Sequence, residues 1–252
     1  MWVYWIVMAE NSCPKVEEVE DFIARFQDVY GPALSNLHNY SRVVSMAWLE
    51  KFLRENSLVQ QEHVGVISGN EQELELRFLQ YQKLTTTNID TGFNLDDDLT
   101  KKEAFGCNFI LLNQVLEHVF NPRQVFRNIK HHLADGGYFY ISIPTINCIH
   151  GDPFFYSSGF HPRYLERMAK EFNFDVIGLG YWGSPKYMVH AVSGRKWLSH
   201  DDLLPGYHGE HDVMFPNFIA VDGRHQVDLV SKSMGFPETI TDCWVLLRKK
   251  SI

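Results

Sequence analysis

The chain has 252 residues, of which 45% are hydrophobic and 14% aromatic, and its formal net charge is -8. This length and apolar content suffice for one large folded domain, and the many aromatic residues exclude a solvated, disordered tail. No basic stripe of the kind that binds a nucleic-acid backbone is present, so we expect no nucleic-acid partner.

The cysteines stand far apart in the sequence, without any CxxC pair, which argues against a zinc knuckle or a thioredoxin-like site. They are Cys13, Cys107, Cys148 and Cys243. We therefore expect free thiols in a reducing cytoplasm. The apolar run over residues 2–8 is far shorter than the ~20 residues of a membrane helix, and it lacks the basic segment of a signal peptide. No membrane association is expected.

Two helices are expected first, over residues 16–30 and 41–55, because apolar residues recur there at helical spacing. From residue 62 onward, short apolar runs alternate with helical patterns. Strands are expected at 63–68, 84–90, 108–113, 138–144, 174–179 and 242–248, and helices at 71–80, 115–133 and 162–172. This alternation predicts an α/β fold with a mostly parallel central sheet and helices on both faces.

We expect residues 1–252 to form a single domain. Its parts are an N-terminal helical extension over 15–56, a core over 62–183, an insertion over 184–240 and a last strand within 241–252. The insertion is long, irregular and rich in His, Gly, Pro and Asp. Loops of this length inside a compact domain are usually functional or disordered, and the aromatic residues of this one favour an ordered cap over a substrate.

Two segments carry a resemblance to a known family. Residues 109–122 read FILLNQVLEHVFNP, and residues 133–144 read LADGGYFYISIP. They resemble the stretch from the fourth to the fifth strand of the class I S-adenosylmethionine (SAM)-dependent methyltransferases, especially the type 11 group, where a vLEHv-x-x-P helix and an L-x-x-G-G turn join two strands. The resemblance extends from about His63 to Gly183, and it implies a Rossmann-like fold with SAM as cofactor. The family's third strand is expected to be short or missing here.

The turn after the first strand departs from the family pattern of an acidic residue followed by GxGxG. Gly65 stands where the acid is expected, and only Gly69 of the glycines remains, between Ser68 and Asn70. Ligands of open α/β sheets lie at the carboxyl ends of the strands, so the resemblance assigns these four residues to the methionine part of SAM. The alternative is an ordinary strand-to-helix turn, with Ser68 or Asn70 as its cap.

Further polar residues follow the next strands. The resemblance implies that Asn88 and Asp90 bind the ribose hydroxyls, while the alternative is a turn-forming Asn-x-Asp cluster. Asp96 falls where the family contacts the adenine amino group, although three adjacent acids are more often a solvated face. Asn113 and Gln114, at the end of the fourth family strand, are expected to line the cofactor pocket.

Glu117 and His118 raise the question of a metal site. Ubiquinone-pathway O-methyltransferases carry an E-x-x-E-H metal site at a similar place, but here Gln114 replaces the first acid. Two firm ligands rarely suffice for a catalytic metal. We therefore expect no metal ion and interpret the two residues as a structural pair near the pocket.

The segment after residue 144 points to the acceptor. Residues 144–156 resemble a P-x-H-G-x-P-x-x-Y/F loop of methyltransferases that act in cell-surface sugar or other small-molecule pathways, and residues 174–183 resemble the same group's GFEV…WG stretch. The resemblance implies a small-molecule or sugar-type acceptor, with His150, Tyr156 and His161 on its side of the site. Histidine is a natural base for a hydroxyl nucleophile near neutral pH, although a structural role is the alternative for each.

The reaction implied is in-line transfer of a methyl group from an already activated sulfonium, for which the protein mainly aligns the nucleophile and excludes water. A rival interpretation is a methyltransferase-like binding or scaffold protein that has lost SAM binding. The enzyme requires a turn at residues 67–70 that leaves room for the methionine carboxylate of SAM, whereas in the scaffold protein a side chain fills that space. A nicotinamide-dependent oxidoreductase is disfavoured, because GxGxxG after the first strand is absent.

Overall fold

A computed structural model describes most of the chain apart from its N-terminal region and the expected insertion. The described residues are 40–147, 150–151, 153–182 and 240–251, with Glu18, Asp21, Phe22, Ala24 and Arg25. No helix among them is both long and apolar enough to cross a membrane.

Six strands form one sheet in the order β2-β1-β3-β4-β6-β5. Their bounds are β1 (Gln60–Ile67), β2 (Gln80–Thr87), β3 (Cys107–Asn113), β4 (Leu133–Pro144), β5 (Phe174–Trp182) and β6 (Asp242–Lys249). The strands β2, β1, β3 and β4 pair in parallel, whereas β6 runs antiparallel to both β4 and β5. The sequence-based prediction of a mostly parallel, Rossmann-like sheet is confirmed.

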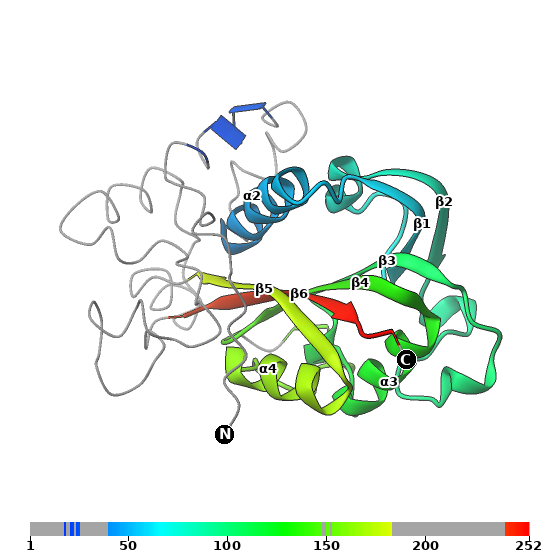
Figure 1. The fold of residues 1–252 in the computed structure, drawn as a ribbon. Coiled ribbons are helices and arrows are strands. Elements are labelled where there is room, and N and C mark those ends of the chain that lie inside the picture. Colours follow the sequence, from blue (N-terminus) through cyan, green and yellow to red (C-terminus); the bar gives the residue numbers. More distant parts are fainter. Residues whose placement is uncertain are drawn as a thin grey trace, which may run out of the picture.

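Helices cover both faces of this sheet (Figure 1). Helix α2 (Tyr40–Glu55) lies on one face, and α3 (Pro122–His132) and α4 (Pro162–Glu171) lie on the other. On the α2 face, the buried ring of Trp48 packs against Tyr140 and Trp244 of the sheet. On the opposite face, Phe126 of α3 packs edge-on against Phe139 of β4. The central strands are therefore covered on both sides, which explains why β3 is a continuous apolar run.

Two predicted helices differ from the structure. The segment expected as a helix over 71–80 forms only a short 3-10 helix, η1 (Leu74–Phe78), because β2 already begins at Gln80. The apolar residues of η1 pack beneath α2. The helix expected from residue 115 begins only at Pro122. Asn121 caps it by accepting a hydrogen bond from the Gln124 N–H, and proline suits a first helical position because it has no N–H to leave unpaired.

Residues 88–106 connect β2 to β3 without forming a strand. They contain the 3-10 helices η2 (Ile89–Thr91) and η3 (Leu99–Lys101), so the third strand of the resembled fold is missing, as expected. At the N-terminus, the five described residues of the helix expected over 16–30 are helical. Most of the insertion expected over 184–240, including residues 184–239, lies outside the described residues.

Candidate functional site

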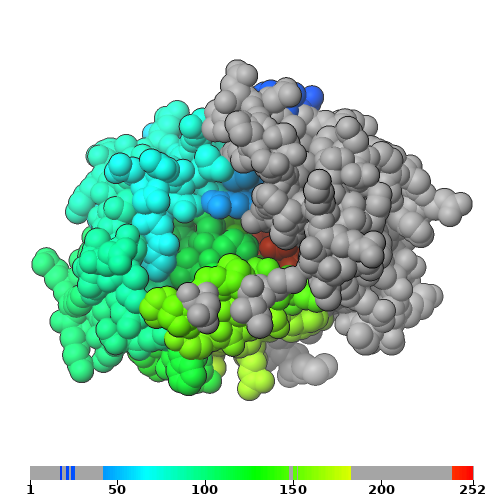
Figure 2. Space-filling view, turned by 180° about the vertical axis from the view of Figure 1, so that it is seen from behind, coloured from blue at the N-terminus to red at the C-terminus, as the bar shows by residue number. Residues whose placement is uncertain are grey.

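The chain reverses its direction across the sheet between β1 and β3. From β1 it continues to β2 on one side, and then returns to β3 on the other side of β1. Ligands of open α/β sheets bind at such a switch point, outside the carboxyl ends of the strands. Figure 2 shows the molecular surface hollowed where blue, cyan and green segments meet, in front of the red last strand. This edge is the candidate ligand site.

The turn after β1 is tight and partly covered. Ser68 has a positive φ of 58°, and its backbone N–H donates to the carbonyl of Thr87 at 2.7 Å. A Cβ atom placed on Gly69 would lie only 3.0 Å from Oε1 of Glu73. Asn70 accepts a hydrogen bond from the Gln72 N–H. Cγ1 of Val66 would lie closer still to a Cβ atom on Gly69, at 2.7 Å, so the side chains of Val66 and Glu73 together occupy the space over Gly69.

Glu73 belongs to a charged network that joins three elements. The guanidinium of Arg42, on α2, donates to Glu73 at 2.7 Å and to the fully buried Glu75 at 3.0 Å. Nδ2 of Asn113, at the end of β3, donates to Glu73 at 3.3 Å. Burial raises the pKa of Glu73, and the charge of Arg42 opposes part of that rise. Oδ1 of Asn113 is buried and has no hydrogen-bond partner among the described residues.

The residues expected at the ribose and adenine lie farther along the same edge. Oδ1 of Asn88 accepts from the Thr91 N–H at 3.0 Å and so caps η2, while Asp90 is exposed within η2. The carboxylate of Asp96 accepts from the backbone N–H groups of Phe120, at 3.1 Å, and Asn121, at 2.7 Å. Asp96 thus holds the start of α3. Asn88 forms the turn that was the alternative to ribose binding, because its side chain caps η2.

Gly65 and Gln114 lie apart from the Glu73 network. Gly65 is in the interior of β1, where a Cβ atom would lie 3.0 Å from Sγ of Cys107. Gln114 has a positive φ of 51°, and its Nε2 lies 3.4 Å from both Ser142 Oγ and Asp242 Oδ1. Its side chain is therefore directed toward β4 and β6.

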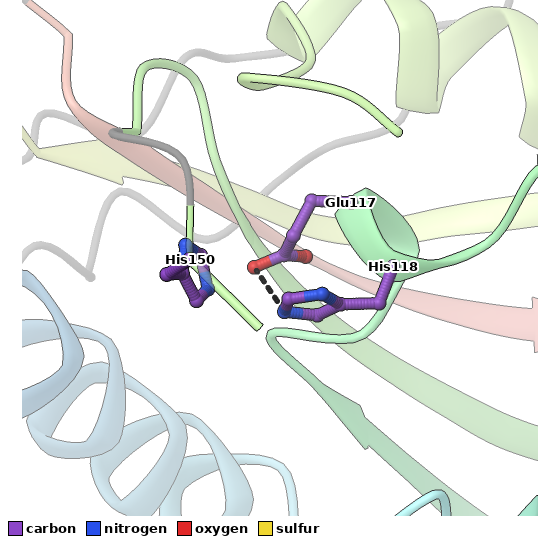
Figure 3. A group of neighbouring side chains, drawn as sticks. All are labelled: Glu117, His118 and His150. Atoms are coloured by element: carbon purple, nitrogen blue, oxygen red, sulfur yellow. Dashed lines mark ion pairs between the residues drawn. The ribbon is translucent and has the colours of Figure 1, made fainter. Parts of the chain in front are cut away.

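Glu117, His118 and His150 form a second group (Figure 3). Glu117 and His118 lie on the single turn η4 (Leu116–His118), and His150 follows β4. Glu117 is fully buried, and burial raises the pKa of its carboxyl to about 7. Nε2 of His118 lies 4.0 Å from Oε1 of Glu117, and the rings of His118 and His150 meet edge-on with centroids 4.7 Å apart.

The other two predicted acceptor-side residues have different surroundings. The backbone N–H of Tyr156 donates to the carbonyl of Glu117 at 2.9 Å, and its exposed ring packs against Phe120 beside a cavity of about 380 Å³. His161 is the N-cap of α4, and its Nδ1 accepts from the Arg163 N–H at 3.1 Å. Burial lowers the pKa of His161. One of its two ring nitrogens is thus committed to the helix.

Sequence reasoning missed Arg42 and Glu73 as site residues. Their pairing depends on how α2 lies over the sheet, which no local pattern reports. A weak signal existed in Glu75, an acid set between Leu74 and Leu76 in an apolar stretch, because a buried carboxylate needs a partner. The proximity of His150 to Glu117 also depends on the fold, since the two lie on different loops.

Comparisons with known proteins agree with this architecture. Solved structures that resemble the chain include a candidate sarcosine dimethylglycine methyltransferase from Galdieria sulphuraria, with a TM-score of 0.51 and 13% identity over 91% of this chain and 98% of that one. Two further structures are 10% identical to this chain. The [4+2]-cyclase SpnF has a TM-score of 0.47, with 96% and 97% coverage. A Haemonchus contortus phosphoethanolamine N-methyltransferase 2 in complex with SAM has a TM-score of 0.45, with 92% and 60% coverage.

At these identities the first structure supports the fold alone, and no curated protein matches the chain. A family described as "Methyltransferase domain" matches residues 31–179. The match covers more than half of the chain and includes α2, the switch point and the Glu117 turn. The chain therefore belongs to the methyltransferase-domain family, a class I methyltransferase family whose cofactor is SAM.

Proposed function

We propose that this protein transfers a methyl group from SAM to a small-molecule acceptor, with a sugar-type molecule as one candidate. The observation that carries the proposal is the pairing of Arg42 with Glu73 at the switch point of the sheet, beside the Oδ1 of Asn113, which has no hydrogen-bond partner among the described residues. The family membership supplies the reaction type, and this local arrangement supplies a place for the cofactor.

The methionine end of SAM carries an ammonium and a carboxylate, so its site must offer both signs of charge. Arg42 and Glu73 offer such a pair within hydrogen-bonding distance of each other. The buried Oδ1 of Asn113 is an acceptor without a partner among the described residues, and an ammonium N–H would satisfy it. These residues fit the methionine end, provided that Glu73 shifts away from Gly69.

The remaining cofactor assignments follow from their position on the edge. We propose that the exposed carboxylate of Asp90 binds the ribose hydroxyls, since charge-assisted hydrogen bonds are strong. Asn88 positions η2 and with it Asp90. Ser68, Gly69 and Asn70 form the turn against which the methionine end lies. For Gly65, Asp96 and Gln114 the described contacts are structural, and we propose that they shape the pocket walls.

On the acceptor side, we propose His150 as the group that takes the acceptor's proton. It is exposed, and it lies next to the buried carboxylate of Glu117, whose charge would stabilise an imidazolium. Tyr156 and Phe120 form an aromatic wall nearby, and we propose that they bind the body of the acceptor. SAM supplies a methyl group that is already activated as a sulfonium, so the chain's own residues need only bind, orient and deprotonate.

The kind of acceptor follows from charge and size. A net charge of -8 disfavours a polyanion such as a nucleic acid. The cavity of about 380 Å³ beside Tyr156 is of the size that small ligands occupy. The described cysteines, Cys107 and Cys243, are free thiols, which supports the proposal of a cytoplasmic location.

One observation favours a second function. Because Glu73 lies over Gly69, the chain could be a family member that has lost SAM binding and acts as a binding or scaffold protein. A transfer assay with methyl-labelled SAM and a panel of small hydroxyl and amine acceptors separates the two. Label transfer that His150→Gln reduces at least about tenfold would support the enzyme. A folded protein without transfer to any acceptor, and without affinity for SAM, would support the scaffold.

A further inference from the structure

The three side chains of Figure 3 converge on one point from two separate segments. Their potential ligand atoms, one from each of Glu117, His118 and His150, all lie within 4.8 Å of one another. We propose that these residues bind a divalent transition-metal ion of the Zn²⁺ class.

The carboxylate of Glu117 supplies the first argument. Its side chain is fully buried, and neither of its oxygens has a hydrogen-bond partner among the described residues. A buried carboxylate without partners is costly, and buried charges are usually paired or bound to metal. In Figure 3 the carboxylate is directed toward the two imidazoles. A cation at this point would satisfy both oxygens.

His118 is held ready to bind a metal. Its Nδ1 lies 2.7 Å from the carbonyl oxygen of Phe154. A carbonyl can only accept, so Nδ1 carries the proton and Nε2 presents a lone pair. That lone pair belongs to the atom 4.0 Å from Glu117. Metal-binding histidines usually have such a second hydrogen bond, which fixes the tautomer and the orientation of the ring.

His150 completes the donor set. Two imidazoles and one carboxylate are the ligands of a well-known class of catalytic zinc site, which keeps a fourth position open. Magnesium and calcium prefer oxygen ligands throughout, so this set selects a transition metal. Zinc bonds of about 2.0–2.1 Å require the ligand atoms to close in by roughly 1 Å from their present spacing. His150 is exposed and on a loop, which leaves room for that movement.

This site is not the E-x-x-E-H arrangement mentioned above. Gln114, which stands in the place of the first acid, is directed toward Ser142 and Asp242 instead. The expectation of no metal counted only the two adjacent ligands, Glu117 and His118, whereas the fold adds a third from the segment after β4.

A metal here would also change how the acceptor is activated, an extension that rests on the proposed function. An acceptor hydroxyl bound at the open position would release its proton to solvent more readily, because the cation stabilises the alkoxide. His150 would then be a ligand rather than a base. Metal binding itself requires neither SAM nor an acceptor, so it can be tested separately.

The experiment is calorimetric titration of the metal-stripped full chain with Zn²⁺, and absorption spectroscopy with Co²⁺ as a probe of coordination. The variants are Glu117→Gln, His118→Gln and His150→Gln. The control is His131→Gln, because His131 is also a described histidine whose ring bonds one backbone carbonyl. Circular dichroism of each protein checks the fold, and the replacement of exposed His150 is the least disruptive of the three.

We expect one site whose Zn²⁺ affinity falls at least about tenfold in each ligand variant and stays unchanged in His131→Gln, together with a Co²⁺ spectrum that His150→Gln abolishes. Absence of Zn²⁺ binding, or binding that all three variants leave unchanged, would overturn the proposal. Titration of the same samples with SAM reports separately on the proposed function, since SAM binding can fail while Zn²⁺ binding persists, and the reverse.

Discussion

The carboxylate of Glu73 accepts a hydrogen bond at 2.7 Å from the guanidinium of Arg42, which lies 31 residues earlier in the chain. This contact ties α2 to the turn after β1, in a family member whose glycine-rich turn has been reduced to one glycine. The pair offers a positive and a negative group at the place where a zwitterionic amino acid moiety would bind. It also places a side chain over Gly69, so that ligand entry and the movement of Glu73 are coupled.

The first prediction concerns Glu73→Gln, which keeps the shape of the side chain but removes its charge. SAM affinity should fall by about tenfold or more, because a charge-assisted hydrogen bond to the ammonium is replaced by a neutral one. Calorimetric titration with SAM measures this. Glu71→Gln, an exposed neighbour on the same turn, is the control and should bind SAM like the unaltered protein. Tighter binding by Glu73→Gln would instead identify Glu73 as an obstacle to the cofactor.

The second prediction concerns Glu75, which is fully buried and paired with Arg42. Removing one partner of a buried ion pair typically costs about 3–5 kcal/mol, and partial exposure of Arg42 reduces the figure. We expect Glu75→Ala to lower the free energy of unfolding by about 2–4 kcal/mol in urea denaturation. The exposed pair of Lys101 with Asp98 provides the comparison, since Lys101→Ala should cost less than about 1 kcal/mol. Equal effects would contradict this account.

The third prediction concerns pH and His132. Burial lowers the pKa of this histidine to about 4, and the nearby positive groups His131 and Lys102 act in the same direction. In the unfolded chain the pKa returns to about 6.5. Between these values the unfolded chain binds more protons, so stability is complete above about pH 6.5 and falls as the pH drops toward 4.

His132→Phe isolates this contribution. Phenylalanine preserves stacking on Phe105, whose ring centroid lies 4.2 Å from that of His132, but it cannot take up a proton. The free energy of unfolding of the unaltered protein, minus that of His132→Phe, should therefore be lower at pH 4 than at pH 7 by about 1–3 kcal/mol. A difference that is constant with pH would show that His132 has the same pKa in the folded and unfolded states, which would contradict this account.

The fourth prediction concerns Gly180 of β5, which lies opposite Trp244 of β6. The indole of Trp244 occupies the space that a Cβ atom would need, and the surrounding core is closely packed. Gly180→Ala should cost about 1–3 kcal/mol through overpacking, measured as a lower thermal midpoint. Asp175→Ala on the same strand alters only a surface ion pair with Lys250 and should change stability by less than about 1 kcal/mol.

The sheet was predictable because each strand is a short run of apolar residues that can be recognised from its own sequence. The apolar run at 108–113 became β3 nearly residue for residue, and the missing third strand followed from the short chain between Asp90 and Phe109. The helix over 71–80 was not predictable from local pattern. Its apolar residues suit a helix, a strand or a 3-10 turn. In the folded chain Leu76 and Phe78 pack against the buried residues of α2, and this packing favours a short 3-10 turn.

The candidate site was predictable only in part. Asn113 and Gly69 lie at the carboxyl ends of β3 and β1, because the order of strands fixes where these ends meet, and their binding of SAM stays a prediction. Arg42 could not be found, since its partners lie 31 and 33 residues away on another element. The role of His150 beside Glu117 likewise depends on how the loop after β4 folds back, and no sequence spacing encodes that distance.

The most direct test of the central claim is calorimetric titration of the purified full chain with SAM and with S-adenosylhomocysteine. We predict binding of both at micromolar dissociation constants, weakened by Asp90→Ala and by Gly69→Trp, which would fill the turn after β1. A folded sample that binds neither compound would contradict the assignment of SAM as its working cofactor and leave a methyltransferase fold retained for binding or scaffolding.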